Sequence, residues 1–188
     1  MQLQDAIKKR KSVRKFSSKK PDWRKIIKAI DSTRWTPMAG NYQTVRFILV
    51  DDPEKIKQIQ VACQQDFVGQ VDHIIVAVSD YEYLRKMYPD FADIYGRQQA
   101  GAAIQTLLLS LVDLGMSSCW VGWFDESEIK RTLTIPEDCA VEAILPVGFE
   151  TKINIARAKK TELEHIIFFN KYKNKYKEQR SKVSVEGA

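Results

Sequence analysis

The sequence predicts a single α+β or α/β domain built around one mixed β-sheet, on the basis of three observations. Segments with helical periodicity alternate with segments of strand periodicity, which favours one sheet with helices packed against it. The stretch 98–114 is apolar around most of its circumference, as expected of a helix buried at the centre of a domain. The chain has 188 residues, a length that suits one domain whose core is complete alone or after dimerisation.

Three helices are expected in the first half of the chain, starting near Leu3, after Asp22 and at Pro53. A carboxylate caps unpaired backbone N–H groups, and proline loses no hydrogen bond in a first helical turn. The residues expected to face the core are Leu3 and Ile7 in the first helix, Ile26, Ile27 and Ile30 in the second, and Ile56, Ile59 and Val61 in the third.

The remaining elements follow from apolar runs and from the turn residues that bound them. Asp125 and Glu128 resemble a capping box, with Ile129 and Leu133 on the inner face of the helix that follows. Strands are expected at 46–50, 73–79, 118–121 and 139–147, helices at 81–88 and 98–114, a loop at 38–44, and a separate apolar run at 166–169.

The net charge of +6 is concentrated near the C-terminus. From residue 171 onward, six basic residues face two acidic ones, so this stretch supplies most of the excess. We therefore expect a main domain at 1–170 and a basic, solvated tail at 171–188. A basic balance can also indicate nucleic-acid binding, but no recognised nucleic-acid-binding motif accompanies the charge, so we expect neither nucleic acid nor membrane as a partner.

The cysteines indicate neither a disulfide framework nor a zinc site. Cys63, Cys119 and Cys139 are an odd number without short spacing, and only two histidines are present. The N-terminus is polar and the longest apolar run, 107–112, is too short to span a membrane. These features predict a cytoplasmic protein without a bound metal.

Three motifs carry candidate chemistry. The basic segment Arg10–Phe16 combines several cations with the Ser12 hydroxyl, which suits a phosphate group, although a basic helix end is also typical of a solvated surface. The MAGNYQ loop (Met38–Gln43) has small residues and side-chain amides that can approach a flat polar ring, or it is an ordinary connection. The CWVGW segment (Cys119–Trp123) surrounds one glycine with aromatic rings, and fits either a ligand pocket or a core strand.

Together these motifs resemble the nitroreductase family of flavoenzymes. The family's helix and RRSxRxF-like motif correspond to Arg10–Phe16, and its PSxxNxQPWRF-like loop and strand correspond to Pro37–Phe47. A later AGAAxQNLLL helix and SCWIG strand correspond to Ala100–Leu109 and Ser118–Phe124, and an IP dipeptide and a strand ending LPLG follow at 135–148. The ordered match covers residue 3 to about residue 170.

The resemblance implies an α+β fold, with a mixed central sheet flanked by helices and a buried central helix. It also implies a homodimer with two FMN sites at the subunit interface. FMN would pass electrons from NADH or NADPH to a nitroaromatic, quinone or similar acceptor. The residues implied to bind FMN are Arg10, Lys11 and Ser12 at the phosphate and ribityl chain, Arg14 at the pyrimidine edge, Pro37, Met38, Ala39, Asn41 and Gln43 from the partner subunit, Trp120, Val121 and Gly122 at the ring, and Lys159 or Lys160 at the phosphate.

The sequence departs from the family pattern where Trp123 replaces a second glycine, and a ring there can cover the flavin. This leaves an alternative, an FMN-binding protein that stores or senses flavin without reductase activity. No protein acid or nucleophile is needed, so His73, His165 and Asp125 are interpreted as structural. Contacts to the acceptor are expected within 67–96, the most variable part of such a fold.

Overall fold

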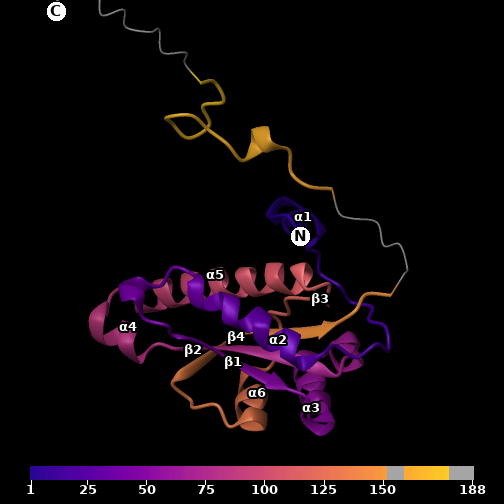
Figure 1. Cartoon of the computed structure of the whole chain (residues 1–188). Coiled ribbons are helices and arrows are strands. Elements are labelled where there is room, and N and C mark those ends of the chain that lie inside the picture. Colours follow the sequence, from indigo (N-terminus) through magenta and orange to yellow (C-terminus); the bar gives the residue numbers. More distant parts are fainter. Residues whose placement is uncertain (152–158, 178–188) are drawn as a thin grey trace, which may run out of the picture. The chain divides into compact units, whose positions relative to one another are not determined.

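The computed structural model describes residues 1–151 and 159–177, which belong to two compact units, Met1–Lys152 and Ile153–Ala188. The first unit contains a four-stranded sheet in the order β1-β2-β4-β3, with helices packed on both faces (Figure 1). Its strands are β1 (Val45–Val50), β2 (His73–Asp80), β3 (Ser117–Ser118) and β4 (Cys139–Gly148). Its α-helices are α1 (Leu3–Lys9), α2 (Trp23–Asp31), α3 (Pro53–Cys63), α4 (Glu82–Met87), α5 (Ala92–Asp113) and α6 (Glu126–Leu133), and its 3-10 turns are η1 (Ser32–Trp35), η2 (Ala39–Asn41) and η3 (Asp66–Gln70).

The α+β class is confirmed, but the sheet is antiparallel rather than mixed. β1 pairs with β2, β2 with β4, and β4 with β3, all in antiparallel register, with an irregularity between Ala77 and Val78. The described residues contain one parallel pairing, an isolated bridge between Ser12 and Ser118. A sequence pattern identifies strands but not their direction, because the same apolar run fits either kind of ladder.

Alternate residues of β2 supply the two halves of the core. Ile75 and Ala77 pack with α2 and α5 on one face of the sheet. Ile74, Val76 and Val78 pack with α3 and α6 on the other face. Since both faces of this strand are covered, its central residues 74–78 are all apolar rather than alternately polar.

The helix beginnings agree with the expected caps. Asp22 accepts a hydrogen bond from the Arg24 N–H, and Asp52, directly before Pro53, accepts from Glu54 and Lys55. The predicted inner faces were partly wrong, because Ile27 is 45% exposed and Val61 is 69% exposed. Each of these two side chains is turned around the helix axis away from the first buried residue of its helix, and therefore points away from the core.

The first helix also differs from expectation. In α1 only Ala6 is buried, whereas Leu3 and Ile7, expected to face the core, are exposed. α1 lies beside the C-terminal end of α5 (Figure 1), where the N-terminal ammonium pairs with Asp113 at 2.7 Å. The apolar side chains of this helix are thus available to another surface.

The long helix α5 is buried on one face only within the chain. It begins at Ala92, before the expected start at Gln98, and contributes Ala103, Leu107 and Leu111 to the core. Its opposite face exposes Ile94, Gln98 and Gln105, and a side-chain atom added at Gly101 would meet nothing within 4 Å.

Two late segments also differ from expectation. The strand expected at 118–121 is reduced to the two residues of β3, with Val121 forming a separate bridge to Ile144. In the second unit, described at 159–177, the apolar run 166–169 forms no strand. It follows η4 (Leu163–His165) and ends in a turn in which the Phe169 N–H donates to the Asn174 carbonyl. No helix in the described ranges is long and apolar enough to cross a membrane.

Candidate functional site

The basic segment Arg10–Phe16 runs from the end of α1 along β3 and the end of β4. The Val13 N–H donates to the Ser118 carbonyl at 3.0 Å, and the Ser17 N–H donates to the Phe149 carbonyl at 2.7 Å. Val13 and Phe16 are buried in the core. These anchors hold the segment against the sheet and leave Ser12, Arg14 and Lys15 exposed.

The segment and the CWVGW segment meet around the Cys119 thiol. Burial raises the pKa of Cys119, while Arg14, a hydrogen bond with the Ser12 side chain, and Arg10 act in the opposite direction. The charges of both guanidinium groups and the Ser12 hydroxyl therefore act on one buried residue of the CWVGW segment. The sequence predicted both segments, and the fold brings them together.

Arg10 and Arg14 are suited to receive an anion. Within residues 1–151 and 159–177, neither guanidinium forms an ion pair with a carboxylate. Arg14 instead lies over the Phe67 ring, 5.9 Å from its centroid. Unpaired guanidinium groups form strong, charge-assisted hydrogen bonds with phosphate and with polar ring edges.

A buried hydroxyl beside the same segment lacks a partner. Ser118 is 5% exposed and bridges to Ser12, yet its Oγ has no hydrogen bond to the described residues. Buried polar groups are usually hydrogen-bonded, so an orphaned hydroxyl on a residue that bridges to the basic segment fits a polar ligand. The donor set at this site is therefore compatible with the phosphate and ribityl groups of FMN.

Lys11 differs from the other cations of the segment. Its Nζ lies 2.7 Å from the Glu150 carboxylate, and both side chains are partly shielded from solvent. Phe16 and Glu150 also form an antiparallel bridge, and the Thr151 N–H donates to the Lys15 carbonyl at 3.2 Å. No sequence pattern indicates Glu150, because its partner is more than a hundred residues away along the chain.

The CWVGW segment offers less backbone to a ligand than expected. Both backbone groups of Val121 are bonded to Ile144, each at 3.0 Å, so its N–H is not available to a flavin. Gly122 is exposed and a side-chain atom built on it would meet nothing within 4 Å. Trp120 is 40% exposed and Trp123 is 75% exposed, so neither ring is buried in the core.

The MAGNYQ loop is fixed to the opposite end of α5. Gly40 has a positive φ of 61° and faces the Tyr83 and Tyr88 hydroxyls, and the rings of Tyr42 and Tyr83 are stacked at 3.9 Å. After the loop, Thr44 donates to Gln99 near the start of α5.

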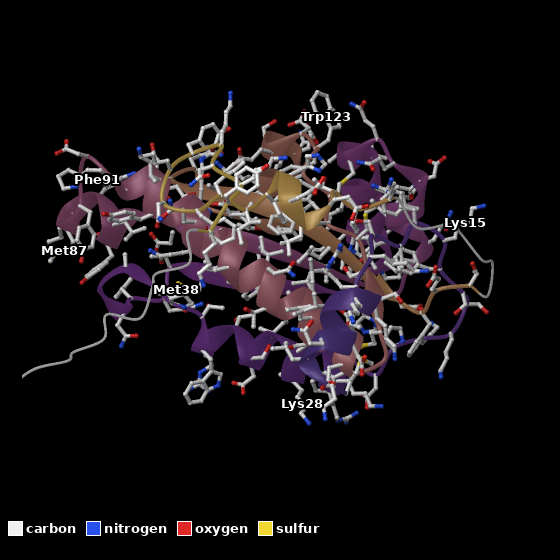
Figure 2. All side chains as sticks on the ribbon, turned by 90° about the horizontal axis from the view of Figure 1, so that it is seen from above. Lys15, Lys28, Met38, Met87, Phe91 and Trp123 are labelled. Carbon is white, nitrogen blue, oxygen red and sulfur yellow. The ribbon has the colours of Figure 1, made fainter. Side chains whose placement is uncertain are left out.

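The loop residues are themselves mostly available to a ligand. Pro37 and Asn41 are exposed, Met38 and Ala39 are half-buried, and the Gln43 side-chain amide donates to the Val45 carbonyl at 3.3 Å. Met38 and Lys15 lie on opposite sides of the unit (Figure 2). One chain therefore does not bring the MAGNYQ loop to the basic segment.

Other predicted residues fall elsewhere. Lys159 and Lys160 are exposed and belong to the second unit. Asp125 caps α6, because its carboxylate accepts from the Ser127 hydroxyl and the Glu128 N–H, and these bonds lower its pKa. His165 is exposed beside Glu164. The Asp125 interpretation as a cap is confirmed.

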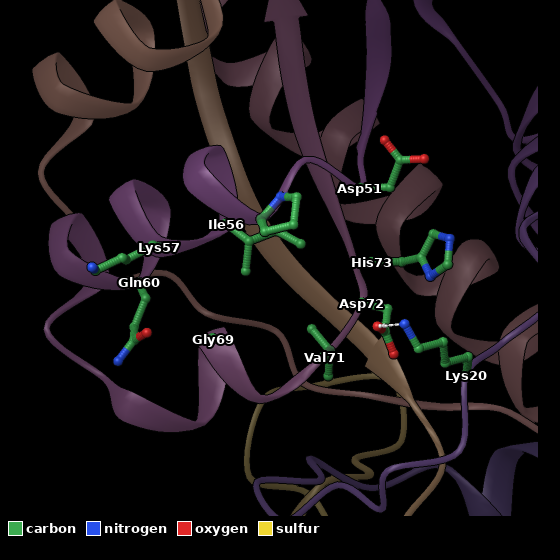
Figure 3. Close-up of a pocket in the computed structure, with 10 residues that line it drawn as sticks. Lys20, Asp51, Ile56, Lys57, Gln60, Gly69, Val71, Asp72 and His73 are labelled. Carbon is green, nitrogen blue, oxygen red and sulfur yellow. Dashed lines mark ion pairs between the residues drawn. The ribbon is translucent and has the colours of Figure 1, made fainter.

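His73 lies at the start of β2, where it lines a separate pocket of about 550 Å³ (Figure 3). The same pocket contains the ion pair of Lys20 and Asp72, at 2.7 Å, and is lined by both acidic and basic side chains. None of its ten lining residues belongs to the basic segment, the MAGNYQ loop or the CWVGW segment. The pocket therefore does not contribute to the candidate cofactor site.

The comparisons with known proteins agree on one family. The model of the Nitroreductase family matches residues 7–65 and 60–149 of the chain. The chain is 27% identical over 164 residues to an iodotyrosine deiodinase of Thermotoga neapolitana, covering 78% of this chain and 88% of that protein. It is 25% identical over 195 residues to an NADPH-dependent oxidoreductase of Staphylococcus haemolyticus, covering 95% and 77%. It shares its fold with an FMN-dependent nitroreductase of Clostridium difficile, with a TM-score of 0.74, 23% identity, and coverage of 89% and 98%.

Proposed function

This chain belongs to the nitroreductase family, and we propose that it is an FMN-dependent NAD(P)H oxidoreductase that acts as a homodimer. The observation that carries the proposal is the bridge that joins Ser12 to Ser118 beside the CWVGW segment, with the Arg10 and Arg14 guanidinium groups unpaired among the described residues. Bound FMN would supply the redox chemistry, the transfer of electrons from NADH or NADPH to a nitroaromatic, quinone or similar small acceptor.

The residues of the basic segment bind and orient the cofactor. Arg10 and Ser12 would hold the phosphate and ribityl groups. Arg14 would supply a positive charge for the pyrimidine edge, where the reduced ring system carries negative charge. The Arg14 guanidinium also lies over the Phe67 ring, 5.9 Å from its centroid. Trp120 and Gly122 would lie next to the ring system.

A second copy of the chain completes the site. The MAGNYQ loop and the basic segment lie on opposite sides of one chain (Figure 2), so a loop that reaches the cofactor belongs to the partner subunit. The exposed face of α5, with Ile94 and the open position at Gly101, supports a subunit contact along this helix. Light scattering coupled to gel filtration tests the assembly, since a monomer that retains FMN would contradict the shared site.

The first test of the proposed function is the visible spectrum of the purified protein. We expect flavin absorption, or uptake of added FMN with quenching of its fluorescence, and bleaching when NADH or NADPH is added without oxygen. A colourless protein that does not take up FMN would overturn the proposal. A screen of nitroaromatics, quinones and halogenated phenols then identifies the acceptor; the halogenated compounds are included because one relative is named a deiodinase.

Trp123 supports a second candidate, an FMN-binding protein that stores or senses flavin without turning over an acceptor. Its ring is 75% exposed next to the open position at Gly122, where it can cover the face of a bound flavin. Stopped-flow mixing with NADH and NADPH distinguishes the two functions. A flavin that binds but does not bleach supports storage or sensing, and rapid bleaching followed by reoxidation by an acceptor supports the reductase.

A further inference from the structure

The ion pair between Lys11 and Glu150 places a negative charge against the basic segment that we take as the phosphate site. The two charged atoms are 2.7 Å apart, and the side chains are 35% and 24% exposed, so solvent screens the pair only in part. The bridge between Phe16 and Glu150 anchors the backbone of Glu150, and the bridge between Ser12 and Ser118 anchors the residue that follows Lys11. Both partners of the ion pair therefore lie on or next to anchored backbone.

Lys11 is the one cation of the basic segment that forms an ion pair within the described ranges. Arg10, Arg14 and Lys15 form none there. A phosphate group carries a charge between about −1 and −2 near neutral pH, so it is repelled by Glu150 as well as attracted by the cations. Riboflavin, which has the same ring and ribityl chain without the phosphate, is uncharged and does not experience this repulsion.

We propose that Glu150 is a specificity-determining residue of the cofactor site: by neutralising Lys11, it limits how strongly the site prefers FMN over riboflavin. The inference rests on the proposed function, because it takes the basic segment as the phosphate site. It assigns to Lys11 the role of an ion-pair partner that holds the segment against the end of β4, and leaves Arg10 and Ser12 as the main phosphate ligands. It also predicts that Lys11 becomes a phosphate ligand when Glu150 loses its charge.

The test measures the dissociation constants of FMN and riboflavin by fluorescence quenching at low salt. In Glu150→Gln, FMN binds at least about threefold more tightly, because one like charge is removed and Lys11 is released, while riboflavin affinity stays within about twofold. Lys11→Met leaves Glu150 unpaired and weakens FMN selectively. The double variant Lys11→Met/Glu150→Gln returns the ratio of the two constants to within about twofold of the wild type, because it removes a neutral pair.

Two further variants separate charge from structure. Glu150→Asp keeps the charge on a shorter side chain and retains the wild-type ratio. Glu137→Gln makes the same change of net charge at the opposite end of β4, in a side chain that is 92% exposed, and changes neither constant.

The outcomes distinguish the inference from the proposed function. A Glu150→Gln variant whose ratio is unchanged, or one that loses affinity for both flavins equally, shows that Glu150 serves only to hold the segment, and overturns the inference alone. A wild-type protein that binds neither flavin overturns the proposed function, and the inference with it. Selective tightening of FMN that disappears at 1 M salt supports the inference, because salt screens the interaction between the charges.

Discussion

The ring of Tyr81 occupies the space that a side chain at position 96 would need. A Cβ atom built on Gly96 would lie 2.3 Å from Tyr81 Cε1, far inside van der Waals contact. The Tyr81 hydroxyl also donates to the Glu142 carboxylate of β4, so the ring is fixed at both ends. This contact joins the connection between β2 and α4 to α5. It requires glycine at this position inside a helix.

Gly96→Ala is expected to destabilise the chain by about 2 kcal/mol, because the buried ring of Tyr81 must move to admit the methyl group. Urea unfolding followed by circular dichroism measures the change. In the background of Tyr81→Ala the same substitution should cost much less, since the obstructing ring is gone. An equal cost in both backgrounds would assign the effect to the helix rather than to the contact.

The three cysteines are expected to differ in reactivity toward iodoacetamide. Burial raises the pKa of Cys63 to about 12 and also raises the pKa of Cys119, so both remain neutral thiols at pH 8. Cys139 is only half-buried, although burial and the charges of Asp80 and Asp138 raise its pKa as well. Mass spectrometry of the native protein should find Cys139 labelled first, and labelling of Cys63 before unfolding would contradict its burial.

The raised pKa of Cys63 makes the free energy of unfolding depend on pH in the alkaline range. The Cys63 thiol has a pKa above its ordinary value of 9.0 in the folded chain, so the neutral thiol is favoured by folding. Its contribution is complete below pH 9 and decreases as the pH rises from there toward 12. Urea unfolding of the wild type and of Cys63→Ala at pH 8 and pH 10.5 isolates this contribution. The difference in free energy of unfolding between the two proteins should be smaller at pH 10.5. An unchanged difference would contradict the raised pKa.

Arg10→Ala is expected to weaken FMN binding about tenfold or more, because a charge-assisted hydrogen bond to phosphate is lost. Affinity for riboflavin should change little. Lys20→Ala is the matched control, since it also removes one cation but one that pairs with Asp72 in the separate pocket (Figure 3). Unchanged FMN affinity in Arg10→Ala would remove this residue from the phosphate site.

Trp123→Ala is expected to raise kcat/KM for a nitroaromatic acceptor by about tenfold if the ring limits access to the flavin face, since removing it opens the position beside Gly122. Trp23→Ala, which removes a half-exposed ring on α2, serves as the control. Equal kcat/KM in Trp123→Ala and the wild type would show that the ring does not obstruct the acceptor.

Much of the candidate site was predictable from local sequence. The basic segment follows a short helix, and the MAGNYQ loop joins a helix to a strand, as the pattern of caps and apolar residues indicates. The cap at Asp125 depends on residues only a few positions away, so local chemistry is sufficient to identify it. The family was recognisable for the same reason, because its motifs are short and ordered along the chain.

Other features depend on which distant residues the fold places together. Glu150 meets Lys11, and Phe67 meets Arg14, only after β4 and η3 have been packed beside the N-terminal segment. The backbone of Val121 was expected to face the ring, but Ile144 of β4 engages it. Contacts between residues far apart along the chain produce no periodic pattern in the sequence, so such a pattern cannot predict them.

Local sequence is sufficient to locate most helices and strands and the residue types that suit a phosphorylated flavin, because these follow from backbone hydrogen bonding, side-chain periodicity and charge. The direction of the strands, the neutralisation of Lys11 by Glu150, and the placement of the MAGNYQ loop on the side of the chain opposite the basic segment depend instead on the folded chain. These features arise from contacts between segments far apart in sequence, whose energies depend on how the two sheet faces are packed.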